Sequence, residues 1–132
     1  MKKKTIQEKP QALIIKSDRN TPNVVFDPNN GSLEIKGRSL PSNPPLFYKK
    51  LNSWIKAYSE FPNKHTTLNI NVEYFNNSSS KCIVELLKQL ENLESKSEVT
   101  VNFYCDKDDS DMLDTGDYFK STTKVPFSTI DA

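Results

Sequence analysis

The stretch TLNINVEYFNNSSSKCIVELLKQLENL at residues 67–93 contains the change of hydrophobic period that decides the fold. From Leu68 to Tyr74 apolar and polar residues alternate, as in a strand with one buried face. After the Asn and Ser residues at 76–80, apolar residues recur at the spacing of one helical face. They are Ile83, Leu86, Leu87, Leu90 and Leu93. Because Asn and Ser are preferred N-cap residues, we predict that a strand ends and a helix begins within residues 76–80.

The residues after this helix predict another strand, a short helix and a last edge strand. The alternating positions of the next strand are Val99, Val101, Phe103 and Cys105. An acidic segment follows at 106–117, and a short helix is expected at about 112–119. The last strand would contain Val125, Phe127 and Ile130. It belongs at a sheet edge because Pro126 has no backbone N–H to donate.

The residues before 67 predict a β-hairpin and a helix. Strands at 24–26 and 33–36 flank a cluster of turn-forming residues at 27–31, in which Gly31 supplies a positive φ. The prolines at 44–45 suit the first turn of a helix. The apolar face of this helix comprises Phe47, Leu51, Trp54, Ile55 and Tyr58.

These elements predict a single α/β domain with a mixed sheet of four to five strands, flanked by helices. Their order is β-β-α-β-α-β-α, with a possible closing strand at 125–130, while the apolar run at 12–15 could add another. Strands joined through helices pair in parallel, whereas the hairpin is antiparallel. A chain of 132 residues is the size of one domain. We expect a flexible basic tail at 1–11 and a domain at 12–132.

Charge and hydropathy exclude several classes of function. Lys and Arg number 18 and Asp and Glu 17, so the chain lacks the concentrated positive charge typical of nucleic-acid binding. No run approaches the roughly 18 apolar residues of a membrane span, and no signal peptide is evident. We therefore expect a cytoplasmic protein whose partners include neither nucleic acid nor membrane.

The inventory of reactive residues is small. With two cysteines and one histidine, the chain cannot form a Cys₂His₂ zinc site. Three glycines do not form a phosphate-binding loop. Cys82 and Cys105 fall in helix and strand patterns, which favours buried thiols. We expect neither an enzyme nor a cofactor.

The acidic segment 106–117 suggests a calcium loop as an alternative. Its oxygen ligands would come from Asp106, Asp108, Ser110, Asp114 and Asp117. However, Asp111 stands where an EF-hand requires glycine, and the last ligand is not glutamate. A solvated acidic loop is the favoured interpretation, and a small metal-binding protein is the less favoured one.

The hydroxyl groups at 76–80 suggest a phosphorylation switch. Backbone N–H groups at a helix start lack intrahelical partners, and the helix dipole is positive there. A phosphate at that place is stabilised locally and adds nearly two negative charges to the surface. The alternative is simple N-capping by Asn77 or Ser78, which requires only one of these residues.

Several ordered motifs extend over residues 20–128. The most specific is EYFNNSSSK at 73–81. The others are Thr21-Pro22-x-Val24-x-Phe26-Asp27, Gly31-x-Leu33-x-Ile35-x-Gly37-Arg38-Ser39-x-Pro41, Phe47-Tyr48 with Leu51 and Trp54, Asp109-x-Asp111-Met112, and Val125-Pro126-Phe127. Together they resemble the SiaC family of bacterial regulatory phosphoproteins, so residues 12–132 are expected to form a SiaC-like regulatory domain.

The resemblance implies a fold related to the anti-sigma-factor antagonists, a STAS-like fold. It also implies a non-enzymatic signalling protein in a partner-switching pathway. Such proteins are phosphorylated by a dedicated Ser/Thr protein kinase and restored by a metal-dependent PP2C-type phosphatase. The unphosphorylated form binds a downstream effector, in one branch a diguanylate cyclase.

One departure from the family concerns the phosphorylated residue. The family's acceptor threonine falls on Asn77, and an amide accepts no phosphoryl group. Either the acceptor has moved to Ser78 or Ser79, or the chain is a constitutively unphosphorylated binding or scaffold protein. The surface expected to bind partners consists of Tyr74, Asn76, Asn77, Ser78, Ser79 and Ser80.

Overall fold

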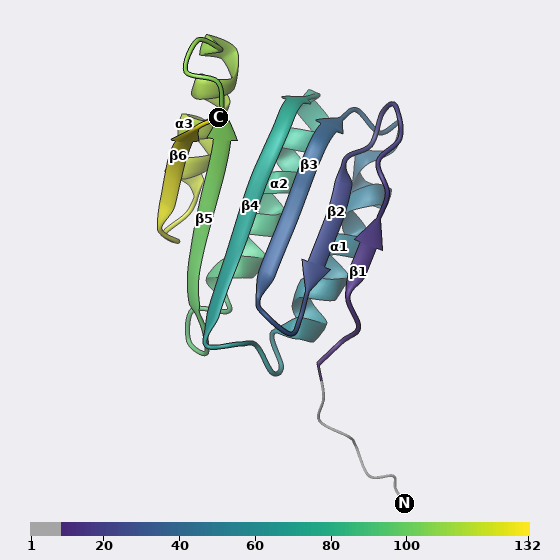
Figure 1. Cartoon of the computed structure of the whole chain (residues 1–132), viewed down its shortest axis with the longest axis vertical. Helices are drawn as coiled ribbons and strands as arrows, with labels where there is room; N and C mark the ends of the chain where they lie inside the picture. Colours follow the sequence, from purple (N-terminus) through teal and green to yellow (C-terminus); the bar gives the residue numbers. More distant parts are fainter. Residues whose placement is uncertain (1–8) are drawn as a thin grey trace, which may run out of the picture.

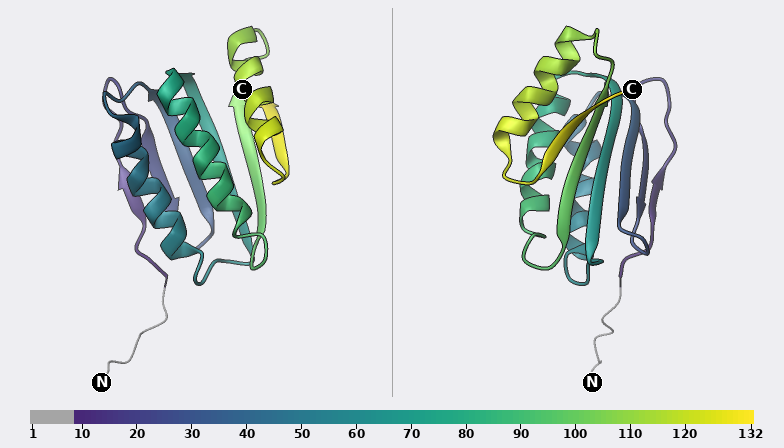
Figure 2. Two further views of the ribbon diagram at one scale, coloured as in Figure 1. Left: turned by 180° about the vertical axis from the view of Figure 1, so that it is seen from behind. Right: turned by 60° about the vertical axis from the view of Figure 1, so that its left-hand side comes forward.

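The structure is a computed structural model, and it describes residues 9–132. Its elements are β1 (Leu13–Ile15), β2 (Asn23–Asp27), β3 (Ser32–Ser39), α1 (Pro44–Tyr58), β4 (His65–Phe75), α2 (Asn77–Glu91), β5 (Glu98–Cys105), α3 (Ser110–Thr122) and β6 (Phe127–Asp131). The strands form one sheet, and the helices cover one face of it (Figure 1). Both views of Figure 2 show this two-layer arrangement.

The sheet has the sequential strand order β1-β2-β3-β4-β5-β6. Strands β1, β2 and β3 pair antiparallel, whereas the pairs β3–β4, β4–β5 and β5–β6 are parallel. Each parallel pair is connected through a helix. The predicted mixed sheet and element order are therefore confirmed. A consequence of this topology is that α1, α2 and α3 all begin at the same end of the sheet, next to the carboxyl ends of β3, β4 and β5.

The sheet contains six strands, so the prediction of four to five was wrong. Both uncertain end segments form strands: residues 13–15 pair with β2, and residues 127–131 pair with β5. Runs this short do not show a period by themselves, and their strand conformation depends on the neighbouring strand. Strand β6 does lie at an edge, as Pro126 indicated. The relation to anti-sigma-factor antagonists stays a prediction.

The turn between β2 and β3 depends on Gly31. Its φ is +72°, as predicted, and its N–H donates to the carbonyl oxygen of Asp27 at 3.1 Å. A Cβ atom at this position would lie 2.2 Å from the carbonyl oxygen of His65. The turn is thus held against the start of β4, where only glycine fits.

Replacing Gly31 with alanine is expected to lower the free energy of unfolding by about 2–3 kcal/mol. Both the left-handed backbone and the collision with His65 contribute to this loss. Gly37 provides a comparison with open space: its φ of +123° also disfavours alanine, but the nearest atom to an added Cβ lies at 3.6 Å. Urea denaturation of both variants measures the difference. A loss for Gly31→Ala of no more than about 1 kcal/mol, the cost of the left-handed backbone alone, would contradict a role for the His65 contact.

The hydrophobic core lies between the sheet and the helices. The predicted face of α2 is buried along its length. On α1 the buried side includes Tyr48, whereas Phe47 is only partly buried. Trp54 stacks on Tyr58 with ring centroids 5.0 Å apart, which confirms that the apolar face of this helix is a packing surface. On the opposite face of the sheet the apolar Ile14 and Val25 lie toward β1, and the central strands are mostly polar. There the Asn102 amide donates to Asn69 at 3.0 Å.

The predicted tail is described only from Lys9 onward, so residues 1–8 lie outside the described residues. Lys9 places its ammonium group 5.6 Å from the centre of the Tyr58 ring. The carbonyl oxygen of Gln11 accepts a hydrogen bond of 2.7 Å from the indole of Trp54. Residues 9–11 therefore lie against α1. No helix within residues 9–132 is long and apolar enough to cross a membrane.

Candidate functional site

The strand-to-helix junction lies where the sequence predicts it. Strand β4 ends at Phe75, and α2 begins at Asn77. The N-cap is Asn76, whose side-chain oxygen accepts a hydrogen bond of 2.8 Å from the backbone N–H of Ser79. Its own N–H donates to the carbonyl oxygen of Ser39 at 3.1 Å, which ties the junction to β3. The cap is therefore neither Asn77 nor Ser78, because the chain leaves the sheet one residue earlier.

A β-bulge precedes the junction. The register passes from the pair Gly37 and Val72 to the pair Arg38 and Tyr74, so Glu73 is an extra residue in β4. Bulges reverse the side to which the following side chains point. As a result Phe75 is buried under the helices, while Tyr74 is half exposed.

The three serines of the junction differ in exposure. Ser78 is exposed, Ser80 is half-buried, and Ser79 is fully buried. The hydroxyl of Ser39 donates to the hydroxyl of Ser79 at 2.9 Å and also lies 2.6 Å from that of Tyr48. Burial raises the pKa of Tyr48, so this hydroxyl remains protonated. The burial of Ser79 removes it from the surface that a partner could touch.

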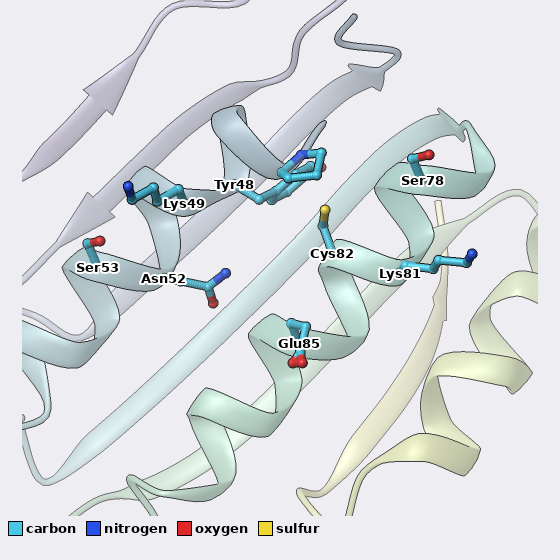
Figure 3. Close-up of a pocket in the computed structure, with 9 residues that line it drawn as sticks. Tyr48, Lys49, Asn52, Ser53, Ser78, Lys81, Cys82 and Glu85 are labelled. Atoms are coloured by element: carbon cyan, nitrogen blue, oxygen red, sulfur yellow. The ribbon is translucent and has the colours of Figure 1, made fainter. Parts of the chain in front are cut away.

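Two depressions flank the first turns of α2. A groove of about 490 Å³ between α1 and α2, the α1–α2 groove, is bounded by residues from Pro45 to Ser53 and from Ser78 to Glu85. Figure 3 shows it from above, with Tyr48 and Cys82 facing each other across it. A second groove of about 440 Å³, the α2–α3 groove, is lined by Asn77 on one side and Asp114 on the other.

Asn77 and Ser78 therefore face different grooves, although they are neighbours in the sequence. Successive residues of a helix point about 100° apart, which accounts for this separation. A phosphate on residue 77 would lie at the α2–α3 groove, near the carboxylate of Asp114. A phosphate on Ser78 would lie at the α1–α2 groove instead. The contribution of α1 to the site was missed from the sequence.

The starts of the three helices differ in charge. The first turns of α1 and α2 contain no acidic residue, and Lys49 and Lys81 border the α1–α2 groove. In contrast, α3 has Asp109 as its N-cap and Asp111 in its first turn. Positive helix ends without acidic neighbours attract anions. The starts of α1 and α2 are therefore suited to anions and the start of α3 is acidic, while Lys81 borders both grooves.

The acidic segment is largely helical. Helix α3 begins at Ser110, earlier than predicted, because the Asp109 side chain caps it by accepting from the N–H of Met112 at 3.1 Å. Asp106 accepts from the N–H of Asp108 at 2.8 Å. These carboxylates thus organise the backbone. Within residues 9–132 no group of three or more His, Cys, Asp or Glu side chains is arranged to hold a metal ion. The calcium alternative gains no support.

The two cysteines are free thiols in different settings. Cys105 is buried, as predicted, but Cys82 is only partly buried, because it borders the α1–α2 groove. Desolvation raises the pKa of the Cys82 thiol, and Glu85 adds to the shift. Burial likewise raises the pKa of the Cys105 thiol, and a raised pKa lowers the fraction of reactive thiolate at both positions.

A model of the SiaC family of regulatory phosphoproteins matches residues 15–132. The chain belongs to the SiaC family. The match extends over the whole sheet from the end of β1, and it includes the junction and both grooves. The family predicted from the sequence motifs is therefore confirmed.

Relatives from Pseudomonas aeruginosa share the fold. An uncharacterised protein of strain UCBPP-PA14 is 22% identical over 117 residues, which cover 88% of this chain and 93% of that protein. The crystal structure of apo-SiaC superimposes with a TM-score of 0.82 at 22% identity, over 90% of this chain and 98% of the other. A chain in the crystal structure of the diguanylate cyclase SiaD in complex with its activator SiaC gives a TM-score of 0.84 at 21% identity, over 91% and 99%.

Proposed function

We propose that this SiaC family chain is a non-enzymatic switch in a cytoplasmic bacterial partner-switching pathway, and that phosphorylation of Ser78 controls it. The observation that carries the proposal is the exposure of Ser78 at the first turn of α2, next to the family's acceptor position at Asn77. Ser79 is buried in a hydrogen-bonded cluster, and Ser80 is half-buried. A kinase therefore finds one exposed serine hydroxyl in the junction.

The fold suits a phosphate at this position. The first N–H groups of a helix have no intrahelical acceptor, and Asn76 satisfies only that of Ser79 with its side chain. The first turn of α2 contains no acidic residue that would repel the phosphate. A phosphoserine here carries a charge of about −1.5 to −2 and interacts favourably with the helix dipole. The domain can thus tolerate the modification while its surface changes strongly.

The proposed partners follow from the family. A Ser/Thr protein kinase would add the phosphate, and a PP2C-type phosphatase would remove it. The effector would be a diguanylate cyclase, since SiaC of P. aeruginosa forms a complex with the cyclase SiaD as its activator. Its binding surface would be the exposed and half-buried part of the junction, namely Tyr74, Asn76, Asn77, Ser78 and Ser80.

Incubation with the kinase and ATP is expected to add a single phosphate, located on Ser78 by peptide mass spectrometry. The Ser78→Ala variant should then remain unmodified, while Ser80→Ala, the matched control, should be modified as the natural protein is. The physical reason is access, because a kinase must bring the acceptor hydroxyl to the γ-phosphate of ATP.

Two results would contradict the proposed switch. A phosphate on Ser79 or Ser80 would show that exposure does not select the acceptor. An unmodified protein that still binds a cyclase would support the constitutive binder that Asn77 suggests.

A further inference from the structure

The α1–α2 groove has the form of a binding site for side chains of another protein. Its volume of about 490 Å³ is within the range of ligand pockets, roughly 300–1,000 Å³. Much of its lining is apolar, with contributions from Pro45, the Tyr48 ring and Cys82. Two helices that border an apolar groove are a common seat for an amphipathic segment.

The end of this groove near the start of α2 is positively charged. Lys49 stands on α1 and Lys81 on α2, and Figure 3 shows them at the two outer rims of the groove, with their flexible side chains extending away from it. Within residues 9–132 the one ion pair joins His65 to Glu98, at the opposite end of the sheet. Neither lysine therefore has an ion-pair partner among the described residues. Glu85, one helical turn after Lys81, is the one carboxylate among the described lining residues.

The wall of the groove also contains an unsatisfied acceptor. The side-chain oxygen Oδ1 of Asn52 is buried and has no hydrogen-bond partner within the described part of the chain. Such an acceptor favours an occupant that brings a donor. Asn52 borders the groove, so a side-chain rotation can turn its amide toward that donor.

We propose that the α1–α2 groove seats an acidic amphipathic segment of the cyclase partner. Apolar side chains of that segment would fill the groove, and its carboxylates would face Lys49 and Lys81. This inference rests on the proposed function, and it adds the place and the chemistry of binding. The α2–α3 groove suits the same segment less well, because it is lined by one lysine, Lys81, and one carboxylate, Asp114, whereas the α1–α2 groove has two lysines and one carboxylate.

This placement explains how one phosphate can prevent binding. Ser78 borders the groove and lies three residues before Lys81, on the same side of α2. Its phosphate would reverse the local charge and repel the carboxylates of the occupant. The segment that binds the unmodified protein is thus the one that the phosphate excludes.

The test is a titration of the full chain with a purified diguanylate cyclase of the source organism, and with P. aeruginosa SiaD as a second probe. The double variant Lys49→Glu and Lys81→Glu should weaken binding about tenfold and reduce its salt dependence. Its matched control is Lys50→Glu and Lys88→Glu, which makes the same change of charge on the same helices outside the groove. The control should bind within about twofold of the natural chain.

A second variant fills the groove without changing its charge. Cys82→Trp should weaken binding at least about a hundredfold, because the ring would occupy the volume of the partner's apolar side chains. Thr100→Trp, on the polar face of the sheet, is its control. If Cys82→Trp does not fold, labelling gives the same information. In a Cys105→Ala background, bound cyclase should protect the Cys82 thiol from maleimide.

The possible outcomes separate the two proposals. If the natural chain binds neither cyclase, the proposed function is overturned. The proposal that a cyclase segment occupies the groove is then overturned as well. Binding by the natural chain that is unaffected by the groove variants, with Cys82 unprotected in the complex, overturns the groove alone. Weakened binding of both groove variants, with the two controls unaffected, supports the groove as the binding site. Where Cys82→Trp does not fold, protection of the Cys82 thiol in the complex supports it instead.

Discussion

Replacing Ser78 with glutamate is expected to weaken cyclase binding at least about tenfold, which corresponds to about 1.4 kcal/mol. The side chain is exposed at the first turn of α2, next to the α1–α2 groove, so a new carboxylate enters the proposed interface. Like charges placed opposite each other across an interface are strongly unfavourable. The loss should be larger at low ionic strength, because salt screens the repulsion. Isothermal titration at two salt concentrations measures both effects.

Ser78→Gln is the matched control for this prediction, because it has the shape of glutamate without its charge. We expect it to bind within about threefold of the natural chain, since a single exposed polar side chain contributes little by itself. An equal loss for Gln and Glu would mean that size, not charge, disturbs the interface. Full affinity of Ser78→Glu would place the switch elsewhere than the start of α2.

The sequence predicted the junction well because the signal is local. The alternation up to Tyr74 and the helical spacing from Ile83 each depend on residues of one element. The structure places the boundary between Phe75 and Asn77, within the predicted range. The sequence also contains a signal that the Ser79 side chain is buried. It lies four residues before Ile83, on the apolar side of α2, although the run of five Asn and Ser residues by itself favours an exposed cluster.

The α1–α2 groove could not be predicted in the same way. It depends on how two helices pack on the sheet, and its lining combines residues about 30 positions apart, such as Tyr48 and Cys82. Both Phe47 and Tyr48 fit a helical period with Leu51, at spacings of four and three. Tyr48 takes the buried position, where its hydroxyl meets Ser39. Which of the two residues is buried therefore depends on Ser39, which lies on β3 and not on the same helix.

The bulge at Glu73 has a further consequence for the junction. Without the extra residue, the alternation from Val72 would place Tyr74 under the helices and Phe75 on the open face. The bulge exchanges these positions, so that Phe75 packs edge-on against Phe119 of α3 with centroids 5.5 Å apart. The start of α2 is thereby fixed to its neighbours on both sides, through Ser39 and through Phe119. We infer a preformed surface that a phosphate changes in charge more than in shape.

Replacing Ser79 with glutamate is expected to destabilise the domain by about 3–5 kcal/mol, the largest effect on stability predicted for this chain. Ser79 is fully buried, and its hydroxyl accepts a hydrogen bond from Ser39 in a cluster that includes Tyr48. A carboxylate there would lose its hydration with no cation to pair with in the cluster. Ser78→Glu, one residue away, should retain its stability or gain slightly from the helix dipole. Urea denaturation of both variants gives the comparison.

The pH dependence of the Ser79→Glu variant provides an independent check of this reasoning. Burial raises the pKa of a carboxyl group, so the folded state would bind the proton more tightly than the unfolded state. A group of this kind costs least when it is protonated in both states, and most when the pH exceeds its folded pKa. The deficit relative to the natural chain should therefore shrink as the pH falls below the raised folded pKa, and it should be smallest once the pH is below about 4, near the ordinary pKa of glutamate. A deficit that is small at neutral pH, or equal to that of Ser78→Glu, would show that Ser79 is accessible, and would restore it as a phosphorylation site.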